Sequence, residues 1–216
     1  MIIFDSVSKI YGNGTIALDN VSFAIGVGEF AIISGPSGSG KTTLMKLLIK
    51  EVDPTNGKIV VDGDNLSDIP GKNIHLLRRK VGVIFQDAKL LEGKTVAENI
   101  DIVLEIMGLT ESEIVKRRND LLELTGIIHH SADFPSQLSG GEAQRLGIAR
   151  ALSTQPKVLF ADEPTGNLDS VTGNNVLREL QILNREYGTT IVIVTHDLAV
   201  SQAVDRVITI KDGKIE

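Results

Sequence analysis

The chain has 216 residues, a formal net charge of −6 and 42% hydrophobic residues, which is enough for one large domain with a substantial core. It has no cysteine, so disulfides, thiolate metal sites and a cysteine nucleophile are excluded, and its acidic balance disfavours tight binding of nucleic acid. Met1 leads directly into an apolar segment without a signal pattern, and no apolar run is long enough to cross a bilayer. We therefore expect one soluble, intracellular domain over residues 1–216.

Two strands are predicted near the start of the chain, over residues 2–8 and 17–25. The second alternates polar and apolar residues, as a half-buried strand does. Tyr11 lies between them in the turn Tyr11-Gly12-Asn13-Gly14. It either covers the edge of a hairpin or stacks on a base, and the local sequence favours the first interpretation because aromatic residues are common in turns.

A phosphate-binding loop is predicted next. Residues 30–34 have the pattern of a buried strand, and GPSGSGKT at residues 35–42 matches G-x-x-x-x-G-K-[ST] immediately before a helical pattern. The glycines allow successive N–H groups to point at an anion, and the helix N-terminus adds its dipole. Lys41 would reach the β- and γ-phosphates of a nucleotide, and the Thr42 hydroxyl would hold Mg²⁺.

The segment after this loop predicts more sheet. Residues 58–62 form a strand pattern, and Asp62-Gly63 is a hairpin signal. The basic cluster at residues 78–80 is interpreted as a solvated face. Residues 81–85 predict another buried strand, and Gln86 at its end is placed to contact Mg²⁺ or an attacking water in a nucleotide-binding fold.

The character of the chain becomes helical from about residue 94 to residue 151. Capping boxes begin at Thr95 and Thr110, and apolar residues follow each at helical spacing. No strand pattern interrupts this region, so we interpret residues 92–150 as a helical subdomain inserted in an α/β core. His129 and His130 are adjacent and have no further His or Cys partner, so a metal site is not expected there.

The sequence LSGGE at residues 138–142 predicts another helix, which runs through Leu152. Ser139 and Glu142 again have capping-box spacing. Gly140 and Gly141 would also expose unpaired N–H groups at a helix N-terminus, which is a second site for an anion.

Two carboxylates follow the next predicted strand, at residues 157–162. Asp162 would bind Mg²⁺, and Glu163 would polarise a water near the γ-phosphate, although a structural salt bridge is an alternative for Glu163. Asp169 is predicted to cap a helix. The face which that helix buries is predicted to consist of Val176, Leu180, Leu183 and Tyr187.

The last strands complete the predicted sheet. Residues 190–195 are rich in β-branched residues, which is typical of a central parallel strand. His196 and Asp197 follow it, at the strand end where such sheets bind ligands, although a single His there could also be structural. Residues 206–210 and 214–216 are predicted to close the fold around the turn at Asp212-Gly213.

Taken together, these motifs resemble those of the ATP-binding cassette (ABC) family over essentially the whole chain. The phosphate loop alone marks a broad class of NTPases, whereas LSGGE followed by a helix and VLFADEP is far more specific. The resemblance implies an α/β P-loop NTPase of the ABC type, with a mixed sheet core, an N-terminal antiparallel β subdomain and an inserted α-helical subdomain. One departure is Ala143, where Gln is more usual; it lies outside the glycines that contact phosphate.

The resemblance also implies a role for each site residue. Tyr11 would stack on adenine, Gln86 would sense Mg²⁺, and Ser139 and Gly141 would bind the γ-phosphate of the other subunit's ATP. Glu163 would be the base that activates water, with His196, Gln86 and Lys41 as further catalytic residues. Asp169 would lie across the dimer interface, and Thr42, Gln86 and Asp162 would hold Mg²⁺. The expected nucleotide contacts are Tyr11, Gly35, Pro36, Ser37, Gly38, Ser39, Gly40, Lys41, Thr42, Thr43, Ser139, Gly140, Gly141, Glu142 and Asp169.

At the level of function, the resemblance implies an ATPase that forms a homodimer on binding ATP. It would lie at the cytoplasmic face of the plasma membrane as a peripheral subunit, with an integral membrane partner in a cell-division system that regulates cell-wall hydrolysis. An ATPase subunit for lipoprotein release or macrolide export is the first alternative. The second is a soluble cassette acting on nucleic acid or ribosomes, which predicts tandem cassettes, long coiled-coil insertions or basic arms that this sequence lacks.

Overall fold

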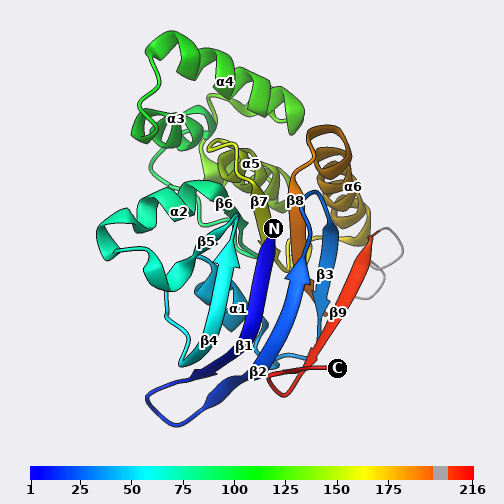
Figure 1. The fold of residues 1–216 in the computed structure, drawn as a ribbon. Helices are drawn as coiled ribbons and strands as arrows, with labels where there is room; N and C mark the ends of the chain where they lie inside the picture. The colour runs from blue at the N-terminus through cyan, green and yellow to red at the C-terminus, as the bar shows by residue number, and fades with distance from the viewer. Residues whose placement is uncertain (197–203) are drawn as a thin grey trace.

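The computed structural model describes residues 1–196 and 204–216, and these form two β-sheets with helices packed on them (Figure 1). A four-stranded antiparallel sheet has the order β2-β1-β4-β5, and a six-stranded sheet has the order β10-β9-β3-β8-β7-β6. The strands of the first are β1 (Ile2–Ile10), β2 (Ile16–Ile25), β4 (Asn56–Val61) and β5 (Asp64–Asn65). Those of the second are β3 (Phe30–Ser34), β6 (Val81–Ile84), β7 (Val158–Asp162), β8 (Thr190–Thr195), β9 (Arg206–Lys211) and β10 (Lys214–Ile215).

The helices cover the six-stranded sheet on both faces. They are α1 (Lys41–Leu48), α2 (Ile74–Lys80), α3 (Val96–Ile106), α4 (Glu111–Leu124), α5 (Gly140–Leu152) and α6 (Ser170–Tyr187). Short 3₁₀ turns are η1 (Leu66–Asp68), η2 (Gly71–Asn73), η3 (Ile128–His130) and η4 (Pro135–Gln137). In Figure 1, α3 and α4 stand at the top of the molecule, and α5 lies between them and the sheet.

The core has two layers, one on each face of the six-stranded sheet. Successive side chains of a strand point to opposite faces, so β8 sends Val192 and Val194 into one layer and Ile191 and Ile193 into the other. The first layer lies between the two sheets and includes α1, and the second packs the sheet against α3 to α6. A sheet buried on both faces explains the continuous apolar runs in its strands.

The order and direction of the strands decide where the functional residues lie. Strands β9, β3, β8, β7 and β6 are parallel neighbours, with Ser34 opposite Thr195, Asp162 opposite Val194 and Ile84 opposite Ala161. The residues that follow these strands therefore gather at one edge of the sheet. That edge is where open α/β sheets bind ligands.

These observations confirm the predicted fold class and correct one packing prediction. The capping boxes at Thr95 and Ser139 are present, and the described chain has no strand between α3 and α5. Tyr187, which the helical spacing predicted to be buried, is 63% exposed. It stands in the last turn of α6, immediately before the left-handed Gly188. No helix in the described ranges has the length and apolar character needed to cross a membrane.

Candidate active site

The phosphate-binding loop connects β3 to α1 and leaves the start of that helix without a side-chain cap. Gly40, at the N-cap, adopts φ of 107° and offers no side-chain acceptor. By contrast, Thr95, Ser139 and Asp169 cap α3, α5 and α6 through side-chain oxygens. The first N–H groups of α1 therefore lack the side-chain acceptor that these other helices supply, which suits them to bind an anion.

Close packing of the backbone explains the glycines of this loop. A Cβ atom on Gly35 would lie 2.0 Å from the Ile210 carbonyl oxygen, and one on Gly40 would lie 2.5 Å from the Ala17 carbonyl oxygen. Neither position has room for a side chain. The Ser39 hydroxyl is buried in the same loop and has no hydrogen-bond partner among the described residues. An unpaired buried hydroxyl beside uncapped N–H groups fits a phosphate ligand.

Lys41 lies folded over the loop that precedes it. Its side chain is buried, and its Nζ donates to the carbonyl oxygens of Gly35 and Pro36, each at 2.9 Å. These bonds hold the ammonium group against the curled backbone. A phosphate is a charged acceptor and would form stronger hydrogen bonds with this group than the neutral carbonyls do.

Tyr11 lies beside the start of α1 although it comes from the β1–β2 hairpin. Its hydroxyl is 3.3 Å from the Thr43 hydroxyl, and Lys9 Nζ lies 5.3 Å from the centre of its ring. The hairpin is closed by the Tyr11 N–H, which donates to Thr15 O at 2.9 Å. The sequence left two interpretations of Tyr11 open. The structure places the Tyr11 hydroxyl beside the first turn of α1, directly after the phosphate loop.

Two carboxylates stand at the end of β7, as the sequence predicted. Burial raises the pKa of Asp162, the neighbouring Glu163 carboxylate raises it further, and Lys41 opposes both effects. A carboxylate in this environment is stabilised in its charged form by a bound cation. Together with the hydroxyl of the exposed Thr42, it supplies the oxygen ligands that Mg²⁺ prefers, so these residues fit a magnesium ion.

Glu163 is held in a defined orientation by two contacts. Its backbone has a positive φ of 46°, and its N–H donates to Val194 O at 2.8 Å. His196 Nδ1 lies 2.9 Å from its Oε1 and 2.8 Å from its Oε2. The Glu163 side chain is 17% exposed and that of His196 is 65% exposed, so the pair borders the solvent at the sheet edge. Asp197, which the sequence placed with His196, lies outside the described residues.

Gln86 follows β6, and two hydrogen bonds join it to Asn167, a residue for which the sequence predicted no role in the site. Its Nε2 donates to Asn167 Oδ1 at 3.3 Å, and Asn167 Nδ2 donates back to Gln86 O at 3.2 Å. The local sequence identifies Asn167 only as a turn residue, because its hydrogen-bond partner Gln86 is far away in the sequence. The reciprocal bonds connect Gln86 to the segment that follows Glu163.

The LSGGE segment lies elsewhere. Ser139 Oγ accepts from the Glu142 N–H at 3.4 Å, and Glu142 Oε2 accepts from the Ser139 N–H at 2.8 Å and from its hydroxyl at 2.7 Å. Gly141 packs so closely on α6 that a Cβ would lie 2.5 Å from Thr172 Cγ2. Within the described chain, no hydrogen bond or ion pair joins residues 139–142 to the phosphate loop. The structure therefore brings together the residues at the sheet edge and leaves this segment apart from them.

The family model described as "ABC transporter" matches residues 18–166, which include the phosphate loop, Gln86, the LSGGE segment and both carboxylates. The chain belongs to the ABC transporter family. It is an ABC-type ATPase, and its cassette fold is shared with solved relatives. The dimeric ATP-binding cassette MJ0796, in a post-hydrolysis state bound to ADP and Pi, matches with a TM-score of 0.92 and 37% identity, covering 100% of this chain and 97% of that one.

Two curated relatives of this ABC cassette carry different names. The cell division ATP-binding protein FtsE of Bacillus subtilis is 45% identical over 216 residues, which is 100% of this chain and 94% of the relative. The methionine import ATP-binding protein MetN of Caulobacter vibrioides is 44% identical over 217 residues, which is 100% of this chain and 65% of the relative. Identity alone does not separate these two functions.

Proposed function

We propose that this ABC ATPase works as a homodimer with two ATP sites, each shared between the copies. The main support is that residues 139–142 stand at the N-terminus of α5, the end of a helix that favours anions, while no hydrogen bond or ion pair among the described residues joins them to the phosphate loop of their own chain. In a head-to-tail dimer each copy would supply this segment to the other's ATP. Closing the dimer would exclude water and bring a second helix N-terminus to the developing charge.

Glu163 is the residue we assign as general base. Its carboxylate lies at the ligand-binding edge, where it would accept a proton from the water that attacks the γ-phosphate. His196 would orient that carboxylate and contact the γ-phosphate. Lys41 would leave the carbonyls of its own loop and bind the β- and γ-phosphates.

We assign Thr42, Asp162 and Gln86 to the magnesium ion. When bound, Mg²⁺ would neutralise the negative charge of the phosphates while the γ-phosphoryl group is transferred to water. The hydrogen bonds between Gln86 and Asn167 would couple binding of Mg²⁺ to the segment that carries Glu163.

The remaining assignments concern the nucleotide and the second copy. Tyr11 would stack on the adenine ring, and its hydroxyl contact with Thr43 would keep it beside the phosphate loop. Residues 35–43 would cradle the phosphates of the same nucleotide, and Ser139, Gly140, Gly141 and Glu142 would approach them from the other copy. Asp169, which caps α6 through the N–H groups of Val171 and Thr172, would lie across the interface.

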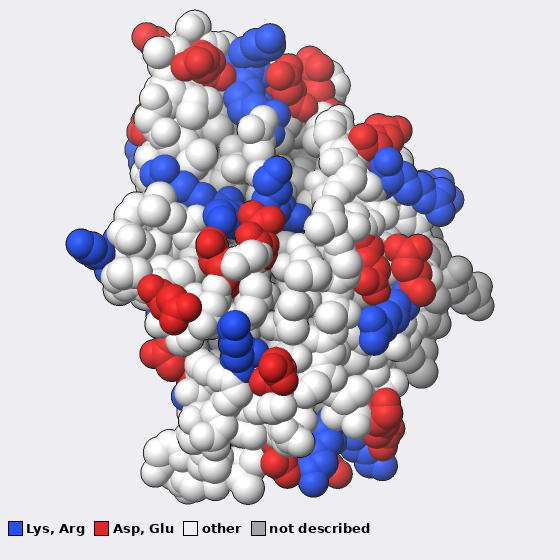
Figure 2. All heavy atoms as spheres, in the orientation of Figure 1, with Lys and Arg blue, Asp and Glu red and all other residues white. Residues whose placement is uncertain are grey.

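We further propose that the complex acts in cell division, with an integral membrane partner resembling FtsX, at the cytoplasmic face of the plasma membrane. Four segments of the sequence resemble FtsE: IIFDSVSKIY, DPTNGKIVVDG, LLRRKVGVIFQDAKLL and FADEPTGNLDS. ATP-driven dimerisation would move the partner, which would regulate cell-wall hydrolysis. Nucleic acid is a poor ligand for this chain, since its net charge is −6 and Figure 2 shows Lys and Arg side chains interspersed with Asp and Glu on the face drawn.

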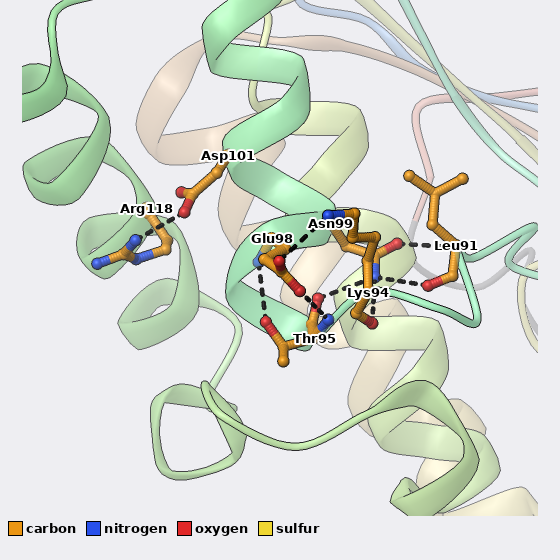
Figure 3. A network of polar contacts seen from close by, with 7 residues as sticks. All are labelled: Leu91, Lys94, Thr95, Glu98, Asn99, Asp101 and Arg118. Atoms are coloured by element: carbon orange, nitrogen blue, oxygen red, sulfur yellow. Dashed lines mark hydrogen bonds and ion pairs between the residues drawn. The ribbon is translucent and has the colours of Figure 1, made fainter.

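The membrane partner would dock in a cavity of about 170 Å³ beside Gln86. Its lining includes Asp87, Leu90 and Glu92 from the segment after β6, and Ala143 from α5. This segment is held at both ends. Arg150 donates to Ala88 O and Lys89 O, each at 2.8 Å, and Asn99 binds both the N–H and the carbonyl of Leu91 (Figure 3). A held segment next to Gln86 would transmit dimer closure to the partner.

Ala88 and Leu90 follow Gln86 but are poor positions for testing this surface. Ala88 is only 9% exposed and packs against Gly147, and Leu90 packs on the core. Charges there would disturb the fold. Glu92 is exposed at the cavity, so Glu92→Arg should reduce co-purification with an FtsX-like protein and leave basal ATPase activity unchanged.

Glu105→Arg is the matched control for that experiment. Glu105 is exposed on α3, does not line the cavity, and undergoes the same reversal of charge. Equal co-purification of both variants with the partner would contradict the proposed docking site. Loss of ATPase activity in Glu92→Arg would instead show damage to the cassette.

The 44% identity to MetN makes methionine import a second candidate function. Depletion in cells separates the alternatives. The cell-division role predicts chains or filaments of undivided cells. Normal division with defective methionine uptake would favour the MetN-like role, and lipoproteins stranded in the inner membrane would favour the lipoprotein-release alternative.

A further inference from the structure

His130 lies between two carboxylates, one on each of its ring nitrogens. Its Nδ1 is 2.8 Å from Asp133 Oδ2, and its Nε2 is 3.1 Å from Glu142 Oε1. A neutral imidazole has only one N–H donor, whereas the imidazolium ion has two. Only the protonated ring can therefore donate a hydrogen bond to both carboxylates.

The same Glu142 carboxylate connects His130 to the LSGGE segment. Its two oxygens have different partners, because Oε1 faces His130 while Oε2 accepts from both the N–H and the hydroxyl of Ser139. The Ser139 hydroxyl is thus occupied by a carboxylate 2.7 Å away. To donate to a phosphate, this hydroxyl must turn away from Glu142.

A phosphate bound by Ser139 would also meet the charge of Glu142. Two successive hydrogen bonds place the phosphate oxygen within roughly 6 Å of the carboxylate, and like charges at that distance repel. A cation on the other side of the carboxylate offsets this repulsion. The same cation also stabilises the Glu142 carboxylate once the Ser139 hydroxyl no longer donates to it.

We propose that His130 is a positioning residue that, when protonated, neutralises Glu142 and releases the Ser139 hydroxyl for the γ-phosphate of the partner copy's ATP. This inference rests on the shared-site function proposed above. It predicts that closure of the ATP dimer is favoured by protonation of a residue that does not touch the nucleotide.

The surroundings of His130 favour the charged form of its ring. The hydrogen bond to Asp133, followed by the charge of Glu142, raises the pKa of His130 above its usual value, while partial burial opposes the rise. These carboxylates belong to the turn after η3 and to α5. Helix α4, which also packs on η3, makes no ion pair with His130 in the described part of the chain.

The test is ATP-induced dimerisation as a function of pH, measured by analytical ultracentrifugation. A Glu163→Gln background prevents turnover, and His130→Gln and His129→Gln are compared in it. His129 is the matched control, because it is the adjacent histidine and is exposed. His196 and the ATP phosphates are present in every sample, so the comparison between variants isolates His130.

We expect the background protein and its His129→Gln variant to dimerise less tightly as pH rises between about 6 and 9. An effect of about tenfold at each site would amount to about a hundredfold for the two sites of the dimer. His130→Gln should lack this dependence and should bind weakly throughout. NMR titration of His130, with and without ATP, provides a second test if that variant does not fold, and the pKa should be higher in the dimer.

Each other outcome has a separate meaning. A dimer that forms with the same pH dependence in His130→Gln, or an NMR pKa that ATP does not raise, overturns the role of His130 and leaves the shared sites intact. Failure of the background protein to dimerise with ATP at any pH overturns the shared-site function, and this inference with it.

Discussion

Asn99 is the residue whose loss should most clearly weaken the segment next to Gln86. It is fully buried on α3, and its Nδ2 donates to the carbonyl oxygens of Leu91, Lys94 and Thr95 at 3.2, 3.2 and 2.9 Å (Figure 3). Its Oδ1 accepts from the Leu91 N–H at 2.9 Å. One side chain thus closes the whole loop between the proposed docking surface and α3.

The structure allows the cost of Asn99→Ala to be estimated. The carbonyls of Leu91 and Thr95 keep backbone donors, from Lys94 and residue 99 respectively, so they remain satisfied. The Leu91 N–H and the Lys94 carbonyl lose the partners that Asn99 provides. Because the loop is partly exposed, we expect a loss of about 2–3 kcal/mol in the free energy of unfolding. For a chain of this size, that is a fall of about 4–12 °C in Tm.

Urea and thermal unfolding followed by circular dichroism measure this loss. Lys94→Ala is the control in the same loop, because it removes only an exposed ion pair with Glu98 and should change stability little. Asn99→Asp tests in addition the direction in which stability changes with pH. The new carboxyl would face three carbonyl oxygens, so its pKa would be raised in the folded state. The variant should therefore lose stability as pH rises from about 4 through that raised pKa. If the free energy of unfolding of Asn99→Ala lay within about 0.5 kcal/mol of that of the original chain, the reasoning would be refuted.

Three further predictions concern the ATP sites. Lys41→Ala should weaken ATP binding itself, measured by calorimetry, since it removes a phosphate contact made before the reaction; unchanged affinity would contradict the assignment. Tyr11→Ala should cost about 1–3 kcal/mol of ATP binding while Tyr11→Phe is tolerated, and equal losses would indicate a role for the hydroxyl contact with Thr43 instead of stacking. Ser139→Arg should abolish activity alone, but mixed with Lys41→Ala protein it should recover part of it, because one shared site of the heterodimer is intact. Absence of recovery despite mixed dimers would argue against shared sites.

The fold could be read from the sequence because its signals are local and agree with one another. Apolar runs at residues 30–34 and 190–195 gave buried strands, and capping boxes at Thr95 and Ser139 gave helix starts. Tyr187 was predicted wrongly because helical spacing identifies one face of a helix but does not show whether its last turn is covered by other residues.

The site was predictable only in part. Motifs with fixed spacing identified the phosphate loop, the carboxylates and the LSGGE segment, and parallel strands explain why several of them meet. The contacts of Asn167 and His130 were not predictable. The Gln86–Asn167 pair is formed by residues 81 positions apart. The role proposed for His130 depends on its contact with Glu142, which lies on another helix. Such pairs depend on tertiary packing, which single-sequence patterns do not contain.

The Glu163→Gln variant tests the central claim, that this chain hydrolyses ATP with Glu163 as the base in sites shared by two copies. Single-turnover hydrolysis and sedimentation should be measured on the same sample with ATP and Mg²⁺. The account predicts that ATP binding is retained, that hydrolysis falls by about 10²–10⁴-fold, and that an ATP-bound dimer accumulates. Near-normal hydrolysis, or full activity from monomers at high dilution, would contradict it.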